Sequence, residues 1–251
     1  MKQLSLIFSL VMLFGGILTS CSKDDDNNGL VADAPGQIAG LGKMEGTPTG
    51  TPFVLPEGVA LNGKINGLSS YGRSAVFSEQ EYSGKQLSSD MLRASQSVDT
   101  VLGSGRYVRV FIPLKNTTAN DITVTFPTGL IILSTSGTYQ NGLLIKKASV
   151  VVPAQSSYNV GLLMYCANSS KSSSSTSEVY EWGVVSNSTQ IMQLCGLFAN
   201  KKVNIEEFAD SELYIYRDQV YSIQGIVWSV TDSQYGLSEA DIQQISAIPN
   251  S

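Results

Sequence analysis

The sequence predicts an α+β fold in which an antiparallel β-sandwich or barrel is followed by a small helical subdomain. Between residues 106 and 165, short runs of β-branched and aromatic residues recur at intervals of roughly 9–14 residues, which is typical of all-β domains. From about residue 186 the apolar residues recur at three- and four-residue steps instead, which indicates helices. Strands first and helices second is the order of an α+β protein.

The composition is typical of extracellular β-rich proteins. Charged residues make up 15% of the 251 residues, and there are 23 glycines with many serines and threonines. The net charge is −5 and Lys and Arg form no cluster, so we expect no nucleic-acid partner. The chain has no histidine, which excludes histidine-based acid–base catalysis and histidine metal ligands. We therefore expect neither a turnover enzyme nor a bound metal or cofactor.

Residues 1–20 are expected to be a signal peptide. Lys2 precedes an apolar run from Leu4 to Leu18 that suits a signal-peptide core and is too short for a comfortable membrane span. The segment Leu18-Thr19-Ser20-Cys21 resembles the lipobox of bacterial lipoproteins. This resemblance implies that Cys21 becomes the first mature residue and carries lipid. The alternative is a plain secretory signal with a free Cys21.

The acidic run that follows, Ser22-Lys23-Asp24-Asp25-Asp26, resembles the export signal of Bacteroidota surface lipoproteins. The resemblance implies a protein that is lipid-anchored in the outer membrane and exposed on the cell surface. Its only contact with the membrane would be the lipid on Cys21. The alternative is that the charge run is simply a solvated part of the tether.

Four regions are expected along the chain. Residues 21–56 are predicted to be a flexible tether, because Asp, Asn, Gly, Pro and Thr dominate and the apolar residues follow no period. Residues 57–105 are ambiguous, and we expect them to add β-structure to the main domain. The main domain covers residues 106–251, with its helical part at about 186–246. Inside the ambiguous region, residues 59–61 and 74–77 are candidate strands and residues 88–96 a candidate helical turn.

Five strands are predicted in the main domain, each rich in β-branched or aromatic residues and bounded by a turn. The alternation is clearest in residues 122–126, which suits a half-buried strand. The last predicted strand runs directly into Cys166. The five strands are residues 107–114, 122–126, 130–133, 143–152 and 158–165, and the fourth is broken by Lys146-Lys147.

Two of the predicted helices have recognisable N-caps. Ser188 is expected to cap a helix that carries Cys195 on one apolar face, together with Ile191, Leu194 and Phe198. Cys195 is most simply a core residue of that helix. The last helix is expected to open at the capping box Ser238-Glu239-Ala240-Asp241, to carry Ala240, Ile242 and Ile245, and to stop before Pro249.

A third helix is predicted around Gln224. Four apolar residues recur there at helical spacing, and Gln224 lies at the edge of their stripe. A buried amide without hydrogen-bond partners costs roughly 1–3 kcal/mol, so its side chain must find partners. One alternative is a hydrogen bond to nearby backbone, and the other is a covalent bond to Cys166. The stripe consists of Val220, Ile223, Val227 and Val230.

The chain has three cysteines, Cys21, Cys166 and Cys195. If Cys21 carries lipid, two remain, and an even pair in an oxidising compartment suggests a disulfide. A Cys166–Cys195 disulfide is therefore an alternative to any bond between Cys166 and Gln224. A free buried Cys166 thiol is the third alternative.

Three short motifs stand in order along the main domain: Tyr165-Cys166-Ala167, Thr189-Gln190, and Ile223-Gln224-Gly225-Ile226-Val227-Trp228. Their order and residue types resemble those of the thioester domains at the tips of Gram-positive surface adhesins. The resemblance covers about residues 106–232. It implies that Cys166 and Gln224 form an internal thioester and that Thr189 and Gln190 help to frame the site. It also implies covalent attachment to a protein or glycan on a host or neighbouring cell.

The chemistry of such a bond needs only the two side chains and a dry site. The Cys166 sulfur attacks the Gln224 carbonyl and expels ammonia, provided that the two groups are held in contact. Water must be excluded, and Trp228, Val227 and Tyr165 are the candidate shield. An amine or hydroxyl on a partner would then be acylated by Gln224, so the protein is a single-use reagent. The alternative function is a non-covalent carbohydrate- or protein-binding surface lipoprotein with an inert Cys166.

Overall fold

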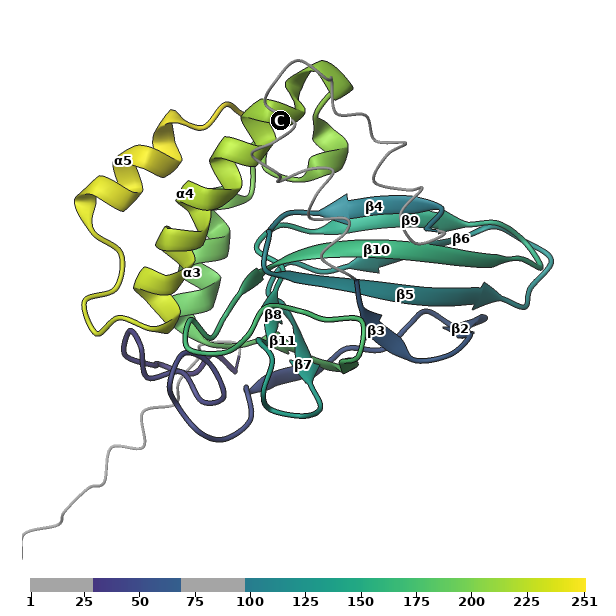
Figure 1. Cartoon of the computed structure of the whole chain (residues 1–251), viewed down its shortest axis with the longest axis horizontal. Coiled ribbons are helices and arrows are strands. Elements are labelled where there is room, and N and C mark those ends of the chain that lie inside the picture. The colour runs from purple at the N-terminus through teal and green to yellow at the C-terminus, as the bar shows by residue number, and fades with distance from the viewer. Residues whose placement is uncertain (1–28, 69–97) are drawn as a thin grey trace, which may run out of the picture.

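The computed structural model, which describes residues 29–68 and 98–251, has the predicted α+β architecture. A β-barrel forms one layer, and the helices of the described part pack together on one side of it (Figure 1). The early strands are β1 (Gly50–Pro52), β2 (Val59–Leu61), β3 (Ile65–Gly67), β4 (Thr100–Gly103), β5 (Val108–Asn116) and β6 (Ile122–Phe126). The later strands are β7 (Leu130–Ser134), β8 (Gly142–Leu143), β9 (Ala148–Val152), β10 (Ser157–Cys166) and β11 (Val179–Ser186). The helical elements are α3 (Thr189–Phe198), η2 (Ile205–Glu207), η3 (Asp210–Glu212), α4 (Leu213–Thr231) and α5 (Glu239–Ala247).

The barrel closes where β5 pairs with β10. The pairing order β5-β3-β11-β7-β8-β10 returns to β5 through an antiparallel register that ends at Met164↔Val108. β2, β4 and β1 extend the edges of this ring, and β6 and β9 form a separate two-stranded sheet. β4 runs parallel to β10, so the sheet departs from the purely antiparallel arrangement that the sequence predicted.

Alternate residues of β10 belong to two different cores, because successive side chains of a strand point to opposite faces. Leu163 and Tyr165 pack with the helices in one apolar cluster. Leu162, Met164 and Cys166 pack with the barrel strands in the other. The end of β10 therefore lies between the helical layer and the barrel interior.

The locally encoded elements agree with the prediction. Residues 122–126 form β6, and residues 59–61 form β2. Ser188 caps α3 by accepting a hydrogen bond from the Ile191 backbone, and Cys195 is buried in α3 as predicted. The predicted stripe of α4 is also buried. Ser238 and Asp241 form the predicted capping box of α5.

The predicted apolar face of α5 is wrong in part. Ile245 is buried, but Ile242 is 41% exposed and Ala240 is exposed as well. Only one turn of this short helix reaches the core, because α5 lies at the outer side of the helical layer (Figure 1).

The strand predicted at residues 143–152, with a break at Lys146-Lys147, is two separate strands, β8 and β9. The break falls at Lys146, whose side chain turns into the helical layer and forms an ion pair with Glu207. Its ammonium also donates hydrogen bonds to the Lys201 carbonyl and the Ser251 hydroxyl, at 2.6 and 3.0 Å. A buried ammonium with these partners fixes the backbone direction there and interrupts the ladder.

The sequence analysis did not predict β11. This strand pairs with β7 on one edge and with β3 and β1 on the other, and it contains a register shift between Trp182 and Val185. Its alternating aromatic and β-branched residues were the available signal.

The flexible tether predicted at residues 21–56 is wrong for its described part, residues 29–56. Ile38 and Leu41 are 3% and 0% exposed and belong to the core of the helical layer. β1 pairs with β11, and Val31 bridges to Ser188 at the start of α3. We call residues 29–48 the N-terminal strap, and in Figure 1 this purple segment runs along one end of the helical layer.

β2, β3 and β4 join the barrel sheet, which agrees with β additions from residues 57–105. Residues 74–77 and 88–96 lie outside the described residues, as do the signal peptide and Cys21. No helix in the described ranges has the length and apolarity needed to span a bilayer.

A substitution in the strap distinguishes a packed segment from a tether. Leu41→Ala should lower the free energy of unfolding by about 2–5 kcal/mol, the range for truncating a buried leucine. Met44→Ala, in the same strap but 43% exposed, should change it by less than about 0.5 kcal/mol. Urea denaturation of both variants measures the difference, and equal stabilities would contradict the packing of the strap.

Candidate functional site

Cys166 and Gln224 are joined by a reciprocal pair of hydrogen bonds. The Cys166 backbone N–H donates to Gln224 Oε1 at 2.9 Å, and Gln224 Nε2 donates to the Cys166 carbonyl at 2.9 Å. The two residues lie 58 positions apart in the chain. The end of a strand and the middle of α4 are therefore brought together as the sequence predicted.

The position of this pair follows from how β10 ends. β5 accompanies β10 only as far as Met164↔Val108, so Cys166 lies beyond the last paired residue on that edge. On the opposite edge, the Ala167 N–H donates to the Asn141 carbonyl at 3.0 Å. Successive residues of a strand turn their backbone groups to opposite edges, so those of Cys166 face the vacated side. The Gln224 amide takes the place of a neighbouring strand there.

Both partners are shielded from solvent. Gln224 is 1% exposed and Cys166 is 0% exposed. The Cys166 N–H and carbonyl and both polar atoms of the Gln224 amide have hydrogen-bond partners, so these groups can be buried without a large cost. Gln224, expected at the edge of its stripe, is thus fully buried.

The Cys166 sulfur accepts two hydrogen bonds. Trp228 Nε1 and the Asn168 backbone N–H each lie 3.3 Å from Cys166 Sγ. Burial raises the pKa of the Cys166 thiol to about 12, although these two donors act to lower it. The nearby Asp232 carboxylate raises the pKa slightly further and Lys171 lowers it. The thiol is therefore protonated at neutral pH.

The predicted alternative of a Cys166–Cys195 disulfide is not formed, because both thiols are free and buried. Cys195 lies on α3 in the core of the helical layer. Cys166 points to the barrel side of β10. The two sulfurs belong to separate apolar clusters.

Tyr165 lies on the other face of β10 from the Cys166 sulfur. It is fully buried against the helical layer, and burial raises the pKa of its hydroxyl above the ordinary tyrosine value. Val227 is also buried in this layer. Of the three predicted shielding residues, Trp228 is the one that touches the sulfur.

The structure connects the Thr189-Gln190 motif to the strap. Both residues are half-buried at the start of α3. The Thr189 N–H donates to the Val31 carbonyl at 2.9 Å. Among the described residues, no hydrogen bond joins either of them to Cys166 or Gln224.

A stack of aromatic and cationic side chains lies beside the pair. The Tyr107 and Trp228 rings stack with centroids 5.7 Å apart and an interplanar angle of 25°. The Arg106 guanidinium lies 5.5 Å from the Tyr107 ring centroid and 3.9 Å from that of Tyr221. Tyr221 and Trp228 lie one turn on either side of Gln224 along α4. In the sequence, Arg106 and Tyr107 stand directly before β5. No local pattern connects them to α4, so this stack was not predicted.

Asn168 is the most important residue that the sequence analysis missed. Besides its N–H on the sulfur, its side-chain Nδ2 donates to the carbonyls of Gly42 at 3.1 Å and Gly40 at 3.3 Å. Its Oδ1 accepts from the Asn141 N–H at 3.0 Å. Only its position two residues after Cys166 could have drawn attention to it.

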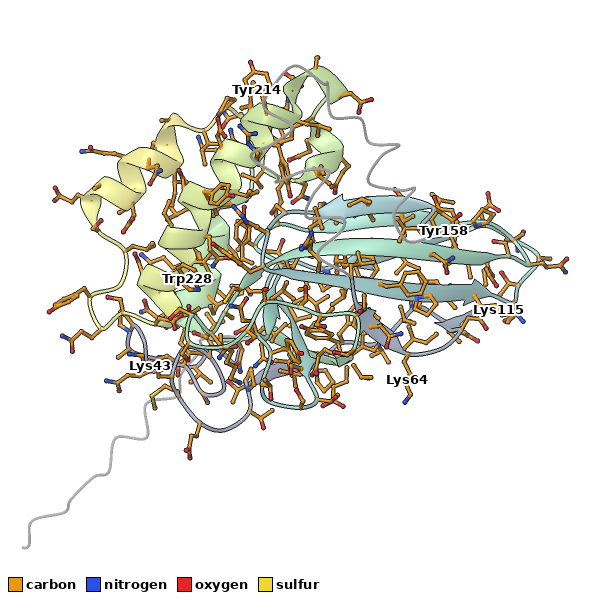
Figure 2. All side chains as sticks on the ribbon, viewed as in Figure 1. Lys43, Lys64, Lys115, Tyr158, Tyr214 and Trp228 are labelled. Carbon is orange, nitrogen blue, oxygen red and sulfur yellow. The ribbon has the colours of Figure 1, made fainter. Side chains whose placement is uncertain are left out.

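A polar cavity of about 700 Å³ lies beside the strap and is lined by Gly40 and residues 42–48 of the strap, the end of β7 and residues 170–171. Figure 2 shows Lys43 of this strap and Trp228 of α4 at the same end of the helical layer. In the described ranges, no group of three or more His, Cys, Asp or Glu side chains is placed to hold a metal ion.

No protein-family model, curated protein or solved structure matches the chain.

Replacing Gln224 should be costly because its amide pairs with buried backbone. Gln224→Leu leaves the Cys166 N–H and carbonyl without this partner, and each unsatisfied group costs about 1–3 kcal/mol. Gln219→Leu on the same helix is the matched control, since Gln219 Oε1 has no hydrogen-bond partner in the described structure. Urea denaturation should show a much larger loss for Gln224→Leu, and similar losses would contradict the pairing.

The raised pKa of Cys166 predicts an unusual pH profile for alkylation. Only the thiolate reacts, so in any fraction with a free Cys166 thiol the rate should rise about tenfold per pH unit from pH 8 to pH 10. In urea-unfolded protein the rate should level off near the ordinary cysteine pKa of about 8.5. Peptide mass spectrometry of iodoacetamide-treated protein measures both profiles. A native plateau below pH 9 would show that the sulfur is not buried as described.

Proposed function

We propose that this protein is a surface adhesin whose Cys166 and Gln224 form an internal thioester that attaches it covalently to a partner. The observation that carries the proposal is the reciprocal hydrogen bonding of these two residues inside a closed site. The resemblance of the three sequence motifs to thioester domains supports it independently. These hydrogen bonds hold the Cys166 main chain against the Gln224 amide, and the proposed reaction brings Sγ onto Cδ from there, with the barrier lowered because both groups are already in one site.

The site provides a donor for each atom that gains charge during bond formation. Sγ of Cys166 attacks Cδ of Gln224, and negative charge develops on Oε1, which already accepts from the Cys166 N–H at 2.9 Å. Trp228 Nε1 and the Asn168 N–H support the sulfur as it becomes a thiolate. The Cδ–Nε2 bond then breaks. Nε2 leaves as ammonia with the proton that the thiol gave up.

Attachment reverses the roles of the same atoms. A partner amine or hydroxyl attacks Cδ of Gln224, the Cδ–Sγ bond breaks, and the proton lost by the nucleophile ends on sulfur. The donors that supported the attacking thiolate now support the leaving one. The product is a stable amide or ester between Gln224 and the partner, so each molecule reacts once. No histidine is needed in either step, which is consistent with a chain that has none.

We propose that the adhesin is held in the outer membrane by lipid on Cys21 and displayed on the cell surface. The support is the lipobox-like segment before Cys21 and the acidic run after it. The partner would be a protein or glycan on a host or neighbouring cell. The acidic net charge of −5 argues against nucleic acid.

A second candidate function is non-covalent binding of a carbohydrate or protein with an inert Cys166. The observation that favours it is the polar cavity of about 700 Å³ beside the strap, within the size range of ligand pockets. On this reading the Gln224 amide serves only to satisfy the end of β10. The two functions differ in one covalent bond, which a mass measurement detects.

Intact mass spectrometry of the mature chain should find a protein lighter by one ammonia than its sequence requires. Cys166→Ala should abolish this loss because the nucleophile is gone, whereas Cys195→Ala, which removes the other buried thiol, should retain it. Methylamine should add to the wild type at Gln224 and free one thiol. A full-mass wild type that takes up no methylamine would exclude the thioester and favour non-covalent binding.

A further inference from the structure

The Cys166–Gln224 pair is closed to any incoming nucleophile. Since Gln224 is 1% exposed and Cys166 is 0% exposed, part of the surrounding structure must move before a partner can reach Gln224 Cδ. The N-terminal strap is hydrogen-bonded to Ala167 and Asn168, the two residues that follow Cys166. Ile38 and Leu41 anchor the strap in the apolar core, and main-chain hydrogen bonds at glycines join it to the ends of β10 and α4.

The strap is bonded to both elements that carry the pair. The Gly42 N–H donates to the Ala167 carbonyl at 2.6 Å, one residue after Cys166. The Gly36 N–H donates to the Val230 carbonyl at 2.9 Å, in the last turn of α4. The strap therefore spans the junction between the end of β10 and the end of the Gln224 helix.

Asn168 links the strap to the sulfur. Its Nδ2 holds the carbonyls of Gly40 and Gly42, while its backbone N–H donates to Cys166 Sγ. Asn141 Nδ2 donates to the same Gly40 carbonyl at 3.1 Å. Movement of the strap would thus remove two hydrogen bonds from the residue that supplies one of the two donors to the sulfur.

The close approach of the strap to the end of α4 requires glycine at position 42. Gly42 has φ +58°, and a Cβ on it would lie 2.0 Å from the Thr231 carbonyl oxygen. A side chain there is incompatible with the seated position, so the backbone must move away from α4.

We propose that the N-terminal strap is a gate over the Cys166–Gln224 pair, with Asn168 as the positioning residue that couples the gate to the sulfur. Seated, the strap keeps water from the acyl group. Released, it admits the acceptor. This inference rests on the proposed thioester for its consequence in acyl transfer, but the gate itself is testable without that bond.

The test compares Gly42→Ala with Gly137→Ala in the mature chain. Gly137 has φ +70° but nothing within 4 Å of an added Cβ, so it carries similar backbone strain without a clash. Gly42→Ala should incorporate methylamine at Gln224 and lose the thioester to water about tenfold faster than wild type, as expected if the closed state is weakened by about 1.4 kcal/mol. Gly137→Ala should match wild type. Equal rates for the two variants would overturn the gate.

Asn168→Asp gives a second variant in case Gly42→Ala does not fold. It keeps the Oδ1 acceptor for the Asn141 N–H but loses the donor to Gly40 and Gly42 and places a carboxylate against their carbonyls. Faster methylamine uptake is again expected. Unchanged uptake in folded Asn168→Asp would show that the strap does not control access.

If the wild type proves to have no thioester, the proposed function fails and the gate is tested on the free thiol. Iodoacetamide should then label Cys166 faster in Gly42→Ala than in wild type, while Cys195 on α3 serves as the internal reference. A selective increase at Cys166 supports the gate. An equal increase at both cysteines indicates general loosening and overturns it, as does no increase at either.

Discussion

The pairing of the Gln224 side chain with the Cys166 main chain is the interaction on which the rest of the structure depends. β5 ends short of Cys166, so the closing strand of the barrel presents an N–H and a carbonyl with no strand beside them. Burying these groups unpaired would be costly, and the Gln224 amide satisfies both. Helix α4 is thereby fixed against the end of β10. The two cores meet at the end of β10, where Cys166 packs in the barrel core and Tyr165 packs in the helical core.

How far the sequence predicts this fold depends on the range of the forces involved. The alternation of β6 and the cap of α3 are local patterns, and both were predicted. The strap was mistaken for a tether because Ile38 and Leu41 show no period, and the core that they enter is built from strands and helices far along the chain. The interruption at Lys146-Lys147 was predicted, but its cause was not, because the charge partner of Lys146, Glu207, comes from a 3-10 turn far along the chain.

The same distinction applies to the candidate site. Cys166, Gln224 and Trp228 were found because they stand in recognisable motifs, and the structure brings the three together. Asn168 was missed because its role depends on contacts with Gly40 and Gly42, which lie more than a hundred residues away in the chain. Thr189 bonds to the strap at Val31 and has no direct bond to the pair in the described structure. If the strap is a gate, this contact makes the Thr-Gln motif part of its support.

The high pKa of the buried Cys166 thiol gives the proposed gate a chemical consequence beyond access. A thioester releases its sulfur as a thiolate, and a thiol of lower pKa leaves faster. Burial raises the pKa of Cys166 to about 12, so in the closed state the sulfur is a poor leaving group and the acyl bond is protected. Opening the strap would admit water around the sulfur and relieve the desolvation that raises its pKa. The movement that admits the acceptor would then also make the sulfur easier to displace, so that reactivity and access rise together.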